Sequence, residues 1–442
     1  MKFNKLCVLG LGYIGLPTAA TFAAHGLKVH GVDINPRVVD TLNEGRIHIH
    51  EPGLQTAVES ALRSGNLTVS SSPEEADAFI IAVPTPFQHE KFGDHNGLRY
   101  KLADMRAVTS ATEAILPVLR KGNLVVLEST SPPRTTVELV APILERSNLQ
   151  AGKDFHLCYS PERVLPGQIL RELVENARVI GGITSESARA GRDLYETFVK
   201  GEIHETDATT AEMVKIMENT TRDVNIAIAN EFARLAEKFG VDVWEAIRLA
   251  NLHPRINILS PGPGVGGHCI SVDPWFFVEA APELAQLISQ ARLVNDAQPR
   301  FVVEKVKRAV GGLKNKRIAA LGLAYKPDVD DLRESPAIEV VHLLQDEGAQ
   351  VKAWEPFAPD AKLDGIKLAN DFNSAILDAD AILLLVNHSQ FRNINPASLA
   401  STTSARIAID TVNAWNVTEW QSAGFVLHRL GVNTSPASNR HS

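Results

Sequence analysis

Cysteine is scarce in this chain of 442 residues, which has only Cys7, Cys158 and Cys269. Three scattered cysteines cannot form a disulfide framework. The adjacent His268 and Cys269 lack the spacing of zinc ligands, so we expect no metal. We therefore expect a reducing compartment, where a thiol can be kept for chemistry. A chain of this length buries a large core without such cross-links.

Long apolar runs and long basic runs are also missing. The longest apolar runs, residues 78–83 and 381–386, fall far short of the ~20 residues that a membrane helix needs. The apolar stretch 6–24 superficially resembles a signal peptide, but its glycines and Pro17 fit a strand, turn and helix better. Because no Lys/Arg-rich run is present and the net charge is −8, we expect neither nucleic acid nor a membrane surface as a partner. We predict a cytoplasmic protein.

The chain does have an ordinary globular composition, 44% hydrophobic and 22% charged, which excludes collagen-like, disordered and coiled-coil proteins. In its first part, apolar strands alternate with helices. The expected strands are 5–9, 28–32, 78–83, 123–128 and 156–159, and the expected helices are 16–25, 105–119 and 134–147. Strands separated by helices predict a parallel sheet that is covered on both faces.

The pattern becomes helical near residue 207 and returns to strands at residue 316. Thr209 and Glu212 have the spacing of a capping box, and an amphipathic pattern then continues to Phe239. Further helices are expected at 243–252 and within 274–310, and further strands at 317–323, 350–354, 381–386 and 406–410. We predict an α/β fold with two Rossmann-like, doubly wound parallel-sheet domains, 1–206 and 313–442, joined by a central helical domain, 207–312.

A glycine turn separates the first strand from the first helix. It reads Gly10-Leu-Gly12-Tyr-Ile-Gly15, and Asp33 follows at the end of the second strand. This context is typical of dinucleotide binding: Gly10 permits the tight turn, Gly12 lets backbone approach the pyrophosphate, and Gly15 lets the helix pack on the strand. The Asp33 carboxylate would accept from ribose hydroxyls and disfavour a 2′-phosphate, so we predict NAD. Arg37 keeps NADP open as a minor alternative.

A second glycine cluster, Pro261-Gly-Pro-Gly-Val-Gly-Gly-His-Cys269, lies just before a helix start at Asp273. Such a loop brings backbone close to a ligand and presents the residue at its end. Near helix N–H groups and a histidine, the Cys269 thiol can lose its proton below the usual pKa of ~8.5 and act as a nucleophile. The alternative for any cysteine is a small buried residue. We expect that alternative for Cys7 and Cys158.

Three further groups of polar residues could line a ligand site. Lys215, Asn219 and Arg222 share one face of the long helix, where a solvated polar stripe is an equally good interpretation. The loops 160–167 and 325–336 follow strand ends, where ligand sites of α/β proteins gather. The charged residues of the second loop are Lys326, Asp330, Asp331, Arg333 and Glu334.

Together these segments resemble the UDP-glucose/GDP-mannose dehydrogenase family. Five motifs match in order over nearly the whole chain: the glycine turn, Glu128-Ser-Thr130, the Lys215/Asn219 helix, the loop with Cys269, and the run from Lys326 to Arg333-Glu-Ser-Pro336. The segments that begin at Cys158, Thr221 and His253 look like the branch that acts on UDP-2-acetamido sugars. The resemblance implies UDP-N-acetyl-D-mannosamine as the leading substrate. UDP-N-acetylglucosamine, UDP-N-acetylgalactosamine, UDP-glucose and GDP-mannose remain alternatives.

The resemblance also implies the chemistry, which is two NAD-dependent oxidations at sugar C6 without release of the aldehyde. Cys269 would add to the aldehyde, giving a thiohemiacetal and then a thioester that water hydrolyses to the uronate. Lys215 would act as acid/base and stabilise oxyanion charge. Glu162 and Asp330 would handle protons or order water. Asn219 would serve both the catalytic site and the substrate site.

The resemblance also implies which residues of this chain contact NAD and the UDP-sugar. The implied NAD contacts are Gly10, Gly12, Tyr13, Ile14, Gly15, Asp33, Arg37, Thr85, Thr130 and Arg333. The implied UDP-sugar contacts are Arg163, Val164, Lys215, Asn219, Arg222, His253, Arg255, Gly266 and Lys326. In the family Arg255 often reaches the neighbouring subunit's site, which implies at least a homodimer through the helical domain.

Two features depart from the family pattern. A glycine usually follows the Ser-Thr-x-Pro turn, where this chain has Arg134, and the loop 88–101 is longer and more basic than expected.

Two other protein classes remain open. A β-hydroxyacid dehydrogenase would share the first two domains but would need neither Cys269 nor a second strand-rich domain. A regulatory homologue that binds nucleotide without turnover would not need Lys215, Cys269 and Asp330 together.

Overall fold

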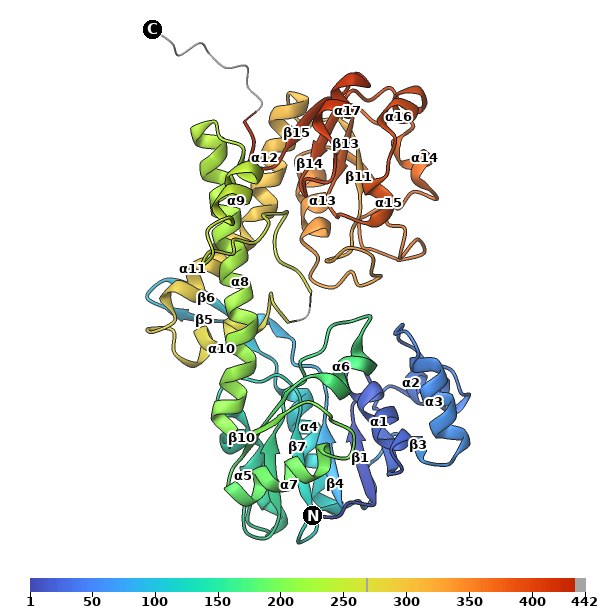
Figure 1. Cartoon of the computed structure of the whole chain (residues 1–442), viewed down its shortest axis with the longest axis vertical. Coiled ribbons are helices and arrows are strands. Elements are labelled where there is room, and N and C mark those ends of the chain that lie inside the picture. Colours follow the sequence, from blue (N-terminus) through green and yellow to red (C-terminus); the bar gives the residue numbers. More distant parts are fainter. Residues whose placement is uncertain (268, 434–442) are drawn as a thin grey trace. The chain divides into compact units, whose positions relative to one another are not determined.

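The computed structural model describes residues 1–267 and 269–433, and the chain forms two compact units. The N-terminal unit comprises Met1–Glu218 and Trp275–Leu284. The C-terminal unit comprises Asn219–Pro274 and the chain from Ala285 onward. Each unit contains its own large sheet (Figure 1). None of the helices in the described residues is long and apolar enough to cross a membrane.

The N-terminal sheet has eight strands in the order β10-β9-β8-β7-β4-β1-β2-β3. These strands are β1 (Lys5–Leu9), β2 (Lys28–Val32), β3 (Leu67–Ser70), β4 (Ala78–Ile81), β7 (Leu124–Leu127), β8 (His156–Tyr159), β9 (Arg178–Gly182) and β10 (Ile203–Asp207). Neighbouring strands are parallel except β8 and β9, which are antiparallel. The doubly wound prediction is confirmed, although the sequence pattern did not reveal β3, β9 or β10.

The central strands bury both faces, which explains their unbroken apolar runs. Leu6 and Val8 of β1 enter the core beside α1 (Gly15–Ala24). Cys7 and Leu9 enter a second core beside α4 (Arg106–Ile115). The sheet order changes direction between β1 and β4, and ligands of such folds bind at the carboxyl ends of the strands at that point.

The other helices of the N-terminal unit are short. They are α2 (Pro36–Asn43), α3 (Leu54–Arg63), α5 (Ala141–Leu144), α6 (Ile169–Glu175), α7 (Ser185–Tyr195) and most of α10 (Asp273–Ala280). The predicted helix 134–147 is divided into a π-helical turn at Thr136–Val140, then α5, then a 3-10 turn at Glu145–Ser147. Pro142 explains the interruption, because it has no N–H for the helical ladder.

The basic segment 88–101 belongs to a β-hairpin rather than to an irregular loop. Strand β5 (Phe87–His95) pairs with β6 (Leu98–Ala103) in antiparallel fashion. The turn residues Asn96 and Gly97 have φ of 52° and 82°, the left-handed conformations of a type I′ hairpin turn.

The C-terminal unit contains a parallel sheet of five strands in the order β12-β11-β13-β14-β15. They are β11 (Arg317–Leu321), β12 (Gln350–Trp354), β13 (Ala381–Leu384), β14 (Ile407–Asp410) and β15 (Val426–Arg429). Alternate residues again enter two cores, Ile318 and Ala320 on one face, Ala319 and Leu321 on the other. The second Rossmann-like sheet is therefore confirmed.

Helices cover the C-terminal sheet and extend from it (Figure 1). They are α9 (Val243–Ala250), α11 (Gln286–Asp296), α12 (Gln298–Val310), α13 (Pro336–Asp346), α14 (Phe372–Ile376), α15 (Ser389–Arg392), α16 (Pro396–Thr402) and α17 (Val417–Ser422). The long helix α8 (Ala208–Phe239) contributes its first turns to the N-terminal unit and the rest to the C-terminal unit.

The start of α8 differs from the predicted capping box. Asp207 accepts from the Thr210 N–H at 2.9 Å and so caps the helix. Glu212 is buried, and its Oε2 accepts from the Arg134 N–H at 2.6 Å instead of from its own helix start. The capping-box prediction is wrong because a contact from a distant segment uses the Glu212 carboxylate.

Candidate active site

The glycine turn after β1 has the close contacts that its composition predicts. A Cβ on Gly10, whose φ is +92°, would lie 2.6 Å from the Ala82 carbonyl oxygen, and one on Gly15 would lie 1.8 Å from the Gly10 carbonyl oxygen. A Cβ on Gly12 would meet no atom within 4 Å, so this side of the turn is open. The N-cap residue Ile14 offers no side-chain acceptor to the first N–H groups of α1. A helix start of this kind fits the pyrophosphate of a dinucleotide.

Asp33 directly follows β2, beside this turn. Its Oδ2 accepts from the Leu11 N–H at 3.0 Å, and its Oδ1 accepts from the Asn35 N–H at 2.9 Å. The carboxylate thus ties the second strand to the glycine turn. His48 faces it, although nothing in the sequence marked His48. Burial lowers the pKa of His48, and the Asp33 charge opposes that shift. Arg37 is exposed in the first turn of α2.

Thr85 and Thr130 follow the neighbouring strands β4 and β7. The Thr85 hydroxyl donates to the Thr130 carbonyl oxygen at 2.7 Å. Because β2, β1, β4 and β7 are consecutive parallel strands, both threonines lie at the same edge of the sheet as Gly10 and Asp33. The structure therefore brings these predicted NAD contacts of the N-terminal unit to one edge.

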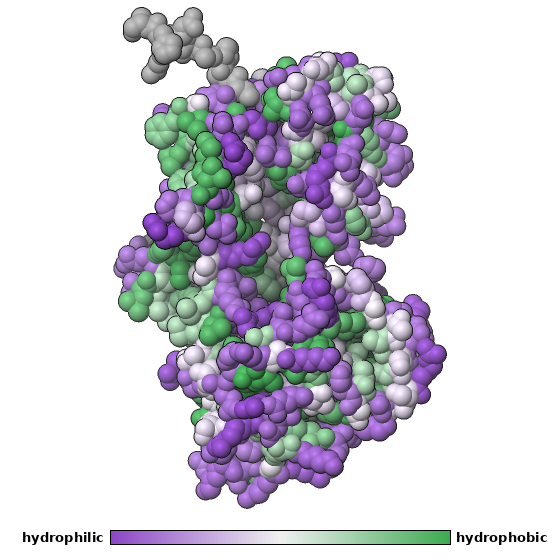
Figure 2. All heavy atoms as spheres, in the orientation of Figure 1, coloured by the Kyte–Doolittle hydropathy of each residue, from purple (hydrophilic) through white to green (hydrophobic). Residues whose placement is uncertain are grey.

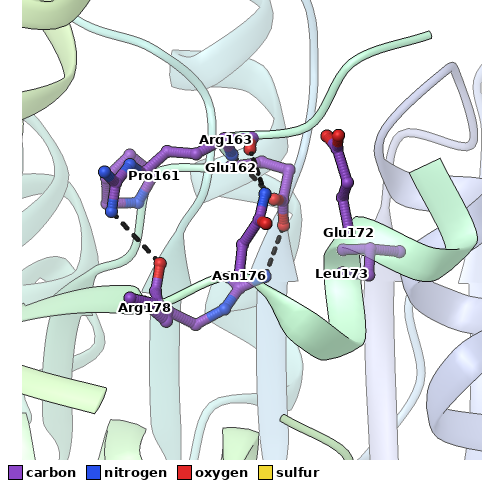
Figure 3. Close-up of a pocket in the computed structure, with 8 residues that line it drawn as sticks. Pro161, Glu162, Arg163, Glu172, Leu173, Asn176 and Arg178 are labelled. Carbon is purple, nitrogen blue, oxygen red and sulfur yellow. Dashed lines mark hydrogen bonds and ion pairs between the residues drawn. The ribbon is translucent and has the colours of Figure 1, made fainter. Parts of the chain in front are cut away.

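Glu162 lines a small pocket just after β8 (Figure 3). The pocket has a free volume of about 10 Å³, which is room for about one water. The Glu162 Oε2 atom accepts from the Arg178 guanidinium, and Oε1 accepts from the Arg163 N–H at 2.7 Å. The Asn176 side-chain amide donates to the Arg163 carbonyl oxygen at 3.0 Å, which holds the loop in place. Glu162 is buried, so this carboxylate is shielded from bulk water.

Arg163 and Val164 are the other predicted residues of this loop. Arg163 Nε donates to Glu218 at 3.1 Å, and its Nη1 donates to the Ala177 carbonyl oxygen at 3.1 Å. Val164 is half-buried and packs against the core beside α1. The Arg163 side chain is therefore already held by protein groups, and Val164 has a packing role.

Lys215 is only 9% exposed on α8, within the N-terminal unit. Among the described residues of that unit, no hydrogen bond or ion pair holds its ammonium group. A buried ammonium without a carboxylate is costly unless a ligand uses it, which favours a functional role over a solvated stripe. Asn219 is half-buried and Arg222 is exposed, so the predicted polar face is not uniformly solvated.

Cys269 is exposed in the C-terminal unit, at the end of the glycine loop. Its carbonyl oxygen accepts from the Asp273 N–H at 2.8 Å, which places the residue in a tight turn before α10. His268 lies outside the described residues. Cys7 and Cys158 are buried as predicted. Burial raises the pKa of the Cys7 thiol to about 12 and that of Cys158 further still, which makes both thiols inert.

The glycine loop packs against the loop that follows β11. The Gly267 N–H donates to the Arg333 carbonyl oxygen at 3.2 Å. A Cβ on Gly266 would lie 2.5 Å from the Glu334 carbonyl oxygen, and one on Gly267 would lie 2.7 Å from the Tyr325 ring. Two motifs that are far apart in the sequence thus meet within the C-terminal unit. Contact with this second loop, and not only approach to a ligand, explains these two glycines.

Asn219 is tied to the segment that carries the thiol. Its side-chain amide donates to the Asp273 carboxylate at 2.5 Å. Asp273 is buried and is the first residue of α10. In the sequence, Asp273 marks only the start of a helix. Its contact with Asn219 comes from the folded structure.

The charged residues of the loop after β11 differ in exposure and in their partners. Arg333 is exposed and donates through Nε and Nη2 to Asp331 at 2.8 and 2.6 Å. Lys326 is half-buried and Asp330 is exposed. Asp330 is therefore accessible to solvent and to a ligand.

Two buried residues that the sequence analysis missed hold this loop. Glu355 accepts from the Leu323 N–H at 2.7 Å, and His388 accepts from the Asp328 N–H at 2.9 Å. The two side chains also contact each other at 3.1 Å. Burial raises the pKa of Glu355, but the hydrogen bonds from His388 and the backbone together hold it below its usual value. Both residues follow other strands of the same sheet, so no local pattern linked them to the loop.

His253 and Arg255 lie on an exposed segment after α9. The Arg255 N–H donates to His253 Nδ1 at 3.4 Å. In the described part of the C-terminal unit, no hydrogen bond joins either residue to the glycine loop. Within one chain, no described hydrogen bond therefore links these two predicted substrate contacts to the loop that carries Cys269.

Comparison with known proteins gives three family matches in chain order. The NAD binding domain of the UDP-glucose/GDP-mannose dehydrogenase family matches residues 4–199. The central domain of that family matches residues 209–297, and its UDP binding domain matches residues 319–417. The prediction of NAD as cofactor is confirmed by the first of these matches and by the dehydrogenase relatives.

Similar proteins extend over almost the whole chain. The UDP-N-acetyl-D-mannosamine dehydrogenase of Methanocaldococcus jannaschii is 48% identical over 431 residues, covering 97% of this chain and 96% of the relative. The NDP-N-acetyl-D-galactosaminuronic acid dehydrogenase of Ralstonia solanacearum is 50% identical over 426 residues, covering 94% and 97%. The solved UDP-D-ManNAc dehydrogenase of Pyrococcus horikoshii has a TM-score of 0.88 and 39% identity, covering 97% of this chain and 99% of that one.

The fold and family expected from the sequence are therefore both confirmed. The glycine turn, the buried lysine and the exposed cysteine lie in the segments that the family matches cover. The chain belongs to the UDP-glucose/GDP-mannose dehydrogenase family and is an NAD-dependent nucleotide-sugar dehydrogenase.

Proposed function

We propose that the chain oxidises the C6 hydroxyl of UDP-N-acetyl-D-mannosamine to a carboxylate in two successive oxidations. The observation that carries this proposal is the exposed Cys269 thiol at the end of a loop packed on the loop 325–336. A four-electron oxidation needs a group that retains the aldehyde, and a thiol does so covalently. The name of the Methanocaldococcus relative supports the choice of sugar.

In the first oxidation the substrate must lose the proton on its C6 oxygen. Lys215 suits this step because it is buried and has no carboxylate partner in its own unit. Its amine can take the proton, and its ammonium can stabilise negative charge on that oxygen. Glu162 and Asp330 are proposed to pass protons or to order water, one from a shielded pocket and the other from an exposed loop.

In the second stage the thiolate of Cys269 adds to the aldehyde carbon, and the aldehyde oxygen takes up a proton from Lys215 to become the hydroxyl of a thiohemiacetal. This adduct is again an alcohol at C6, so it can be oxidised a second time to a thioester. Water then attacks the thioester carbon, releasing the uronate and the Cys269 thiol. The covalent step explains why the chain needs an exposed cysteine as well as Lys215.

NAD, when bound, supplies the hydride acceptor for each oxidation. The residues proposed to hold it are Gly10, Gly12, Tyr13, Ile14, Gly15, Asp33, Arg37, Thr85, Thr130 and Arg333. The residues proposed to hold the UDP-sugar are Arg163, Val164, Lys215, Asn219, Arg222, His253, Arg255, Gly266 and Lys326. The Asp33 carboxylate beside the turn supports NAD over NADP, because a 2′-phosphate would face a negative charge.

The first test is the number of NADH molecules formed per sugar consumed, measured with purified protein and a panel of UDP- and GDP-sugars. We expect two NADH per UDP-N-acetyl-D-mannosamine and little NADH from UDP-glucose. Two NADH from UDP-N-acetylgalactosamine instead would keep the mechanism and change the substrate; the Ralstonia relative makes this the second candidate. One NADH per sugar would mean that the aldehyde is released, and none from any sugar would contradict the proposal.

The covalent step is tested by Cys269→Ala. We expect this variant to form no uronate, whereas the matched variant Cys7→Ala, at a buried thiol in the sheet core, should retain activity. Lys215→Ala should slow the first oxidation severely. A near-normal uronate yield from Cys269→Ala would contradict the thioester mechanism.

We also propose a homodimer formed through the helical segment of the C-terminal unit. On α8, Ile228, Phe232, Leu235 and Phe239 form one stripe at helical spacing and are 42%, 40%, 42% and 74% exposed. Figure 2 shows apolar residues gathered over the C-terminal end of α8 and over α9. An apolar stripe of this kind favours a second copy as its cover.

The dimer is tested by light scattering on the full chain after gel filtration. We expect a dimer mass for the wild type and a monomer mass for Phe232→Glu. The control is Lys238→Glu, which changes charge on the same helix outside the apolar stripe. A monomeric wild type, or a Phe232→Glu variant that stays dimeric, would overturn this proposal.

The three-domain division and a cytoplasmic location complete the proposed description. The division at residues 207 and 313 is supported by the family matches, each of which falls inside one proposed domain. The location is supported by the scarcity of cysteine, which suits a reducing compartment.

A further inference from the structure

A buried charge cluster surrounds Glu162 at the carboxyl edge of the N-terminal sheet. Arg178, the first residue of β9, binds the Glu162 carboxylate (Figure 3). The same guanidinium donates to the Ser160 hydroxyl at 3.1 Å and lies 3.5 Å from the carboxylate of Glu128, which follows β7. The side chains of Arg178, Glu128 and Glu162 are 4%, 0% and 6% exposed. Two buried carboxylates therefore share one guanidinium.

Tyr195 of α7 completes the cluster. Its hydroxyl donates to Glu128 Oε1 at 2.5 Å, and its ring lies under the Arg178 guanidinium at 4.2 Å. The second oxygen of Glu128, Oε2, is buried and has no hydrogen-bond partner within the described chain. A buried carboxylate oxygen without a donor is costly when it carries charge, and protonation lowers that cost because a neutral carboxyl group is less costly to bury.

The antiparallel course of β9 explains how this cluster forms. Strands β7 and β8 are parallel, so Glu128 and the loop with Glu162 leave the sheet at the same edge. Strand β9 runs the other way beside β8, so its first residue, Arg178, lies at that edge as well. Had β9 been parallel, its first residue would lie at the opposite edge.

We propose that Arg178 and Glu128 are positioning residues for Glu162. Arg178 fixes the Glu162 carboxylate, and Glu128 competes for the same guanidinium, so that the proton on Glu128 sets how firmly Glu162 is held. This inference rests on the proposed role of Glu162 in handling protons or ordering water.

The charges around Glu128 determine whether its proton strengthens or weakens the hold on Glu162. The groups that face Glu128 are Arg178 from β9, Glu162 from the loop after β8, Tyr195 from α7 and Cys158 from β8. Burial raises the pKa of Glu128 to about 7; the nearby Arg178 charge opposes this shift, and the Glu162 charge adds to it. Below that pH, Glu128 is neutral and Arg178 pairs with Glu162 alone. Above that pH, the ionised Glu128 also attracts the Arg178 guanidinium and repels Glu162, so Glu162 is held less firmly.

The test compares the pH dependence of kcat for the wild type and Glu128→Gln, which keeps the shape of the side chain but cannot ionise. We expect the ratio of wild-type to variant kcat to be highest near pH 6 and to fall about three- to thirtyfold by pH 9, the range of one contact in a buried charge network. Because both proteins share every other titrating group, the ratio isolates the proton on Glu128. A ratio that stays constant from pH 6 to 9 would overturn the proposal.

Tyr195→Phe is the matched variant, because it removes the hydroxyl that stabilises ionised Glu128 and keeps the ring under Arg178. We expect the midpoint of the fall in kcat to move to higher pH in this variant. Arg178→Lys keeps the positive charge but cannot bridge both carboxylates. It should lower kcat much more than it changes the KM for NAD, and an equal change in both would indicate a merely structural role.

A readout without turnover separates this inference from the proposed function. With the side-chain carboxyl carbons of glutamate labelled with ¹³C, NMR titration of the full chain follows Glu128, whose resonance is assigned by its loss in Glu128→Gln. Glu162→Gln should move the Glu128 titration to lower pH, because a neighbouring negative charge is removed. If no sugar is oxidised but this coupling is present, the proposed function fails and the cluster stands. If oxidation proceeds and Glu128 titrates independently of Glu162, this inference fails alone.

Discussion

Arg134 stands where the family usually has glycine, and its backbone explains why glycine suits the position. Its φ is +75°, in the left-handed region that L-residues avoid. The buried Glu212 carboxylate accepts from the Arg134 N–H and so holds this turn. The Arg134 side chain forms an exposed ion pair with Glu138, and such a pair adds little to the free energy of unfolding. The chain therefore bears backbone strain here that glycine would remove.

We predict that Arg134→Gly raises the stability of the N-terminal unit. Relief of the left-handed strain gains about 1–2 kcal/mol, and the added freedom of the unfolded glycine costs about 0.5–1 kcal/mol. The net gain of about 0.5–1 kcal/mol should raise the melting temperature by roughly 1–4 °C in a thermal unfolding scan. Arg134→Ala is the control, since it loses the same ion pair but keeps the Cβ and the strain. An equal rise in both variants would contradict the explanation.

At the scale of elements, the glycine loop before Cys269 combines two kinds of glycine. Gly266 lies against another backbone, with its missing Cβ 2.5 Å from the Glu334 carbonyl oxygen. Gly262 has no atom within 4 Å of that position. The sequence shows both as the same letter in the same loop. Only the packing of the loop after β11 tells them apart.

We predict that Gly266→Ala lowers kcat by about tenfold or more, because the loop that presents Cys269 must shift to admit the methyl group. Gly262→Ala, the matched control, adds the same methyl group where there is space and should leave kcat close to the wild-type value. Steady-state oxidation of the nucleotide sugar measures both. Equal kcat values for the two variants would show that the contact with Glu334 does not position the thiol.

At the scale of the whole molecule, the buried Glu128 links stability to pH. Its pKa is raised from 4.5 to about 7 in the fold. Between those values the folded chain keeps a proton that the unfolded chain has lost, so stability falls as pH rises through this window and then levels off. The loss amounts to roughly 3 kcal/mol over the window.

Glu128→Gln should remove this dependence. We therefore expect the melting temperature of the variant, relative to that of the wild type, to rise between pH 5 and pH 7 and to stay constant above. Melting curves of both proteins in the same buffers measure the difference. Parallel curves over the whole range would mean that Glu128 is ionised in the folded chain throughout.

The predictions from sequence succeeded where the signal lies between near neighbours in the chain. The glycine turn, the alternation of strands and helices and the long helix all depend on a few consecutive residues and on burial of apolar runs. The roles of Lys215, Glu162 and Cys269 stay predictions, and the hairpin around Asn96 differs from the loop that the sequence predicts. Short or polar strands such as β3 and β10 gave no such signal.

The sequence by itself thus determined the fold class and the family, because these depend on local backbone preference and on periodic burial. The tertiary structure alone decided which partners share a buried space. In the fold, Glu212 accepts a hydrogen bond from the Arg134 turn, and Gly266 lies against Glu334. The fold also brings Glu128, Glu162 and Arg178 together. The physical reason is that a buried polar group takes whichever partner the packing brings within reach, however far away that partner lies in the chain.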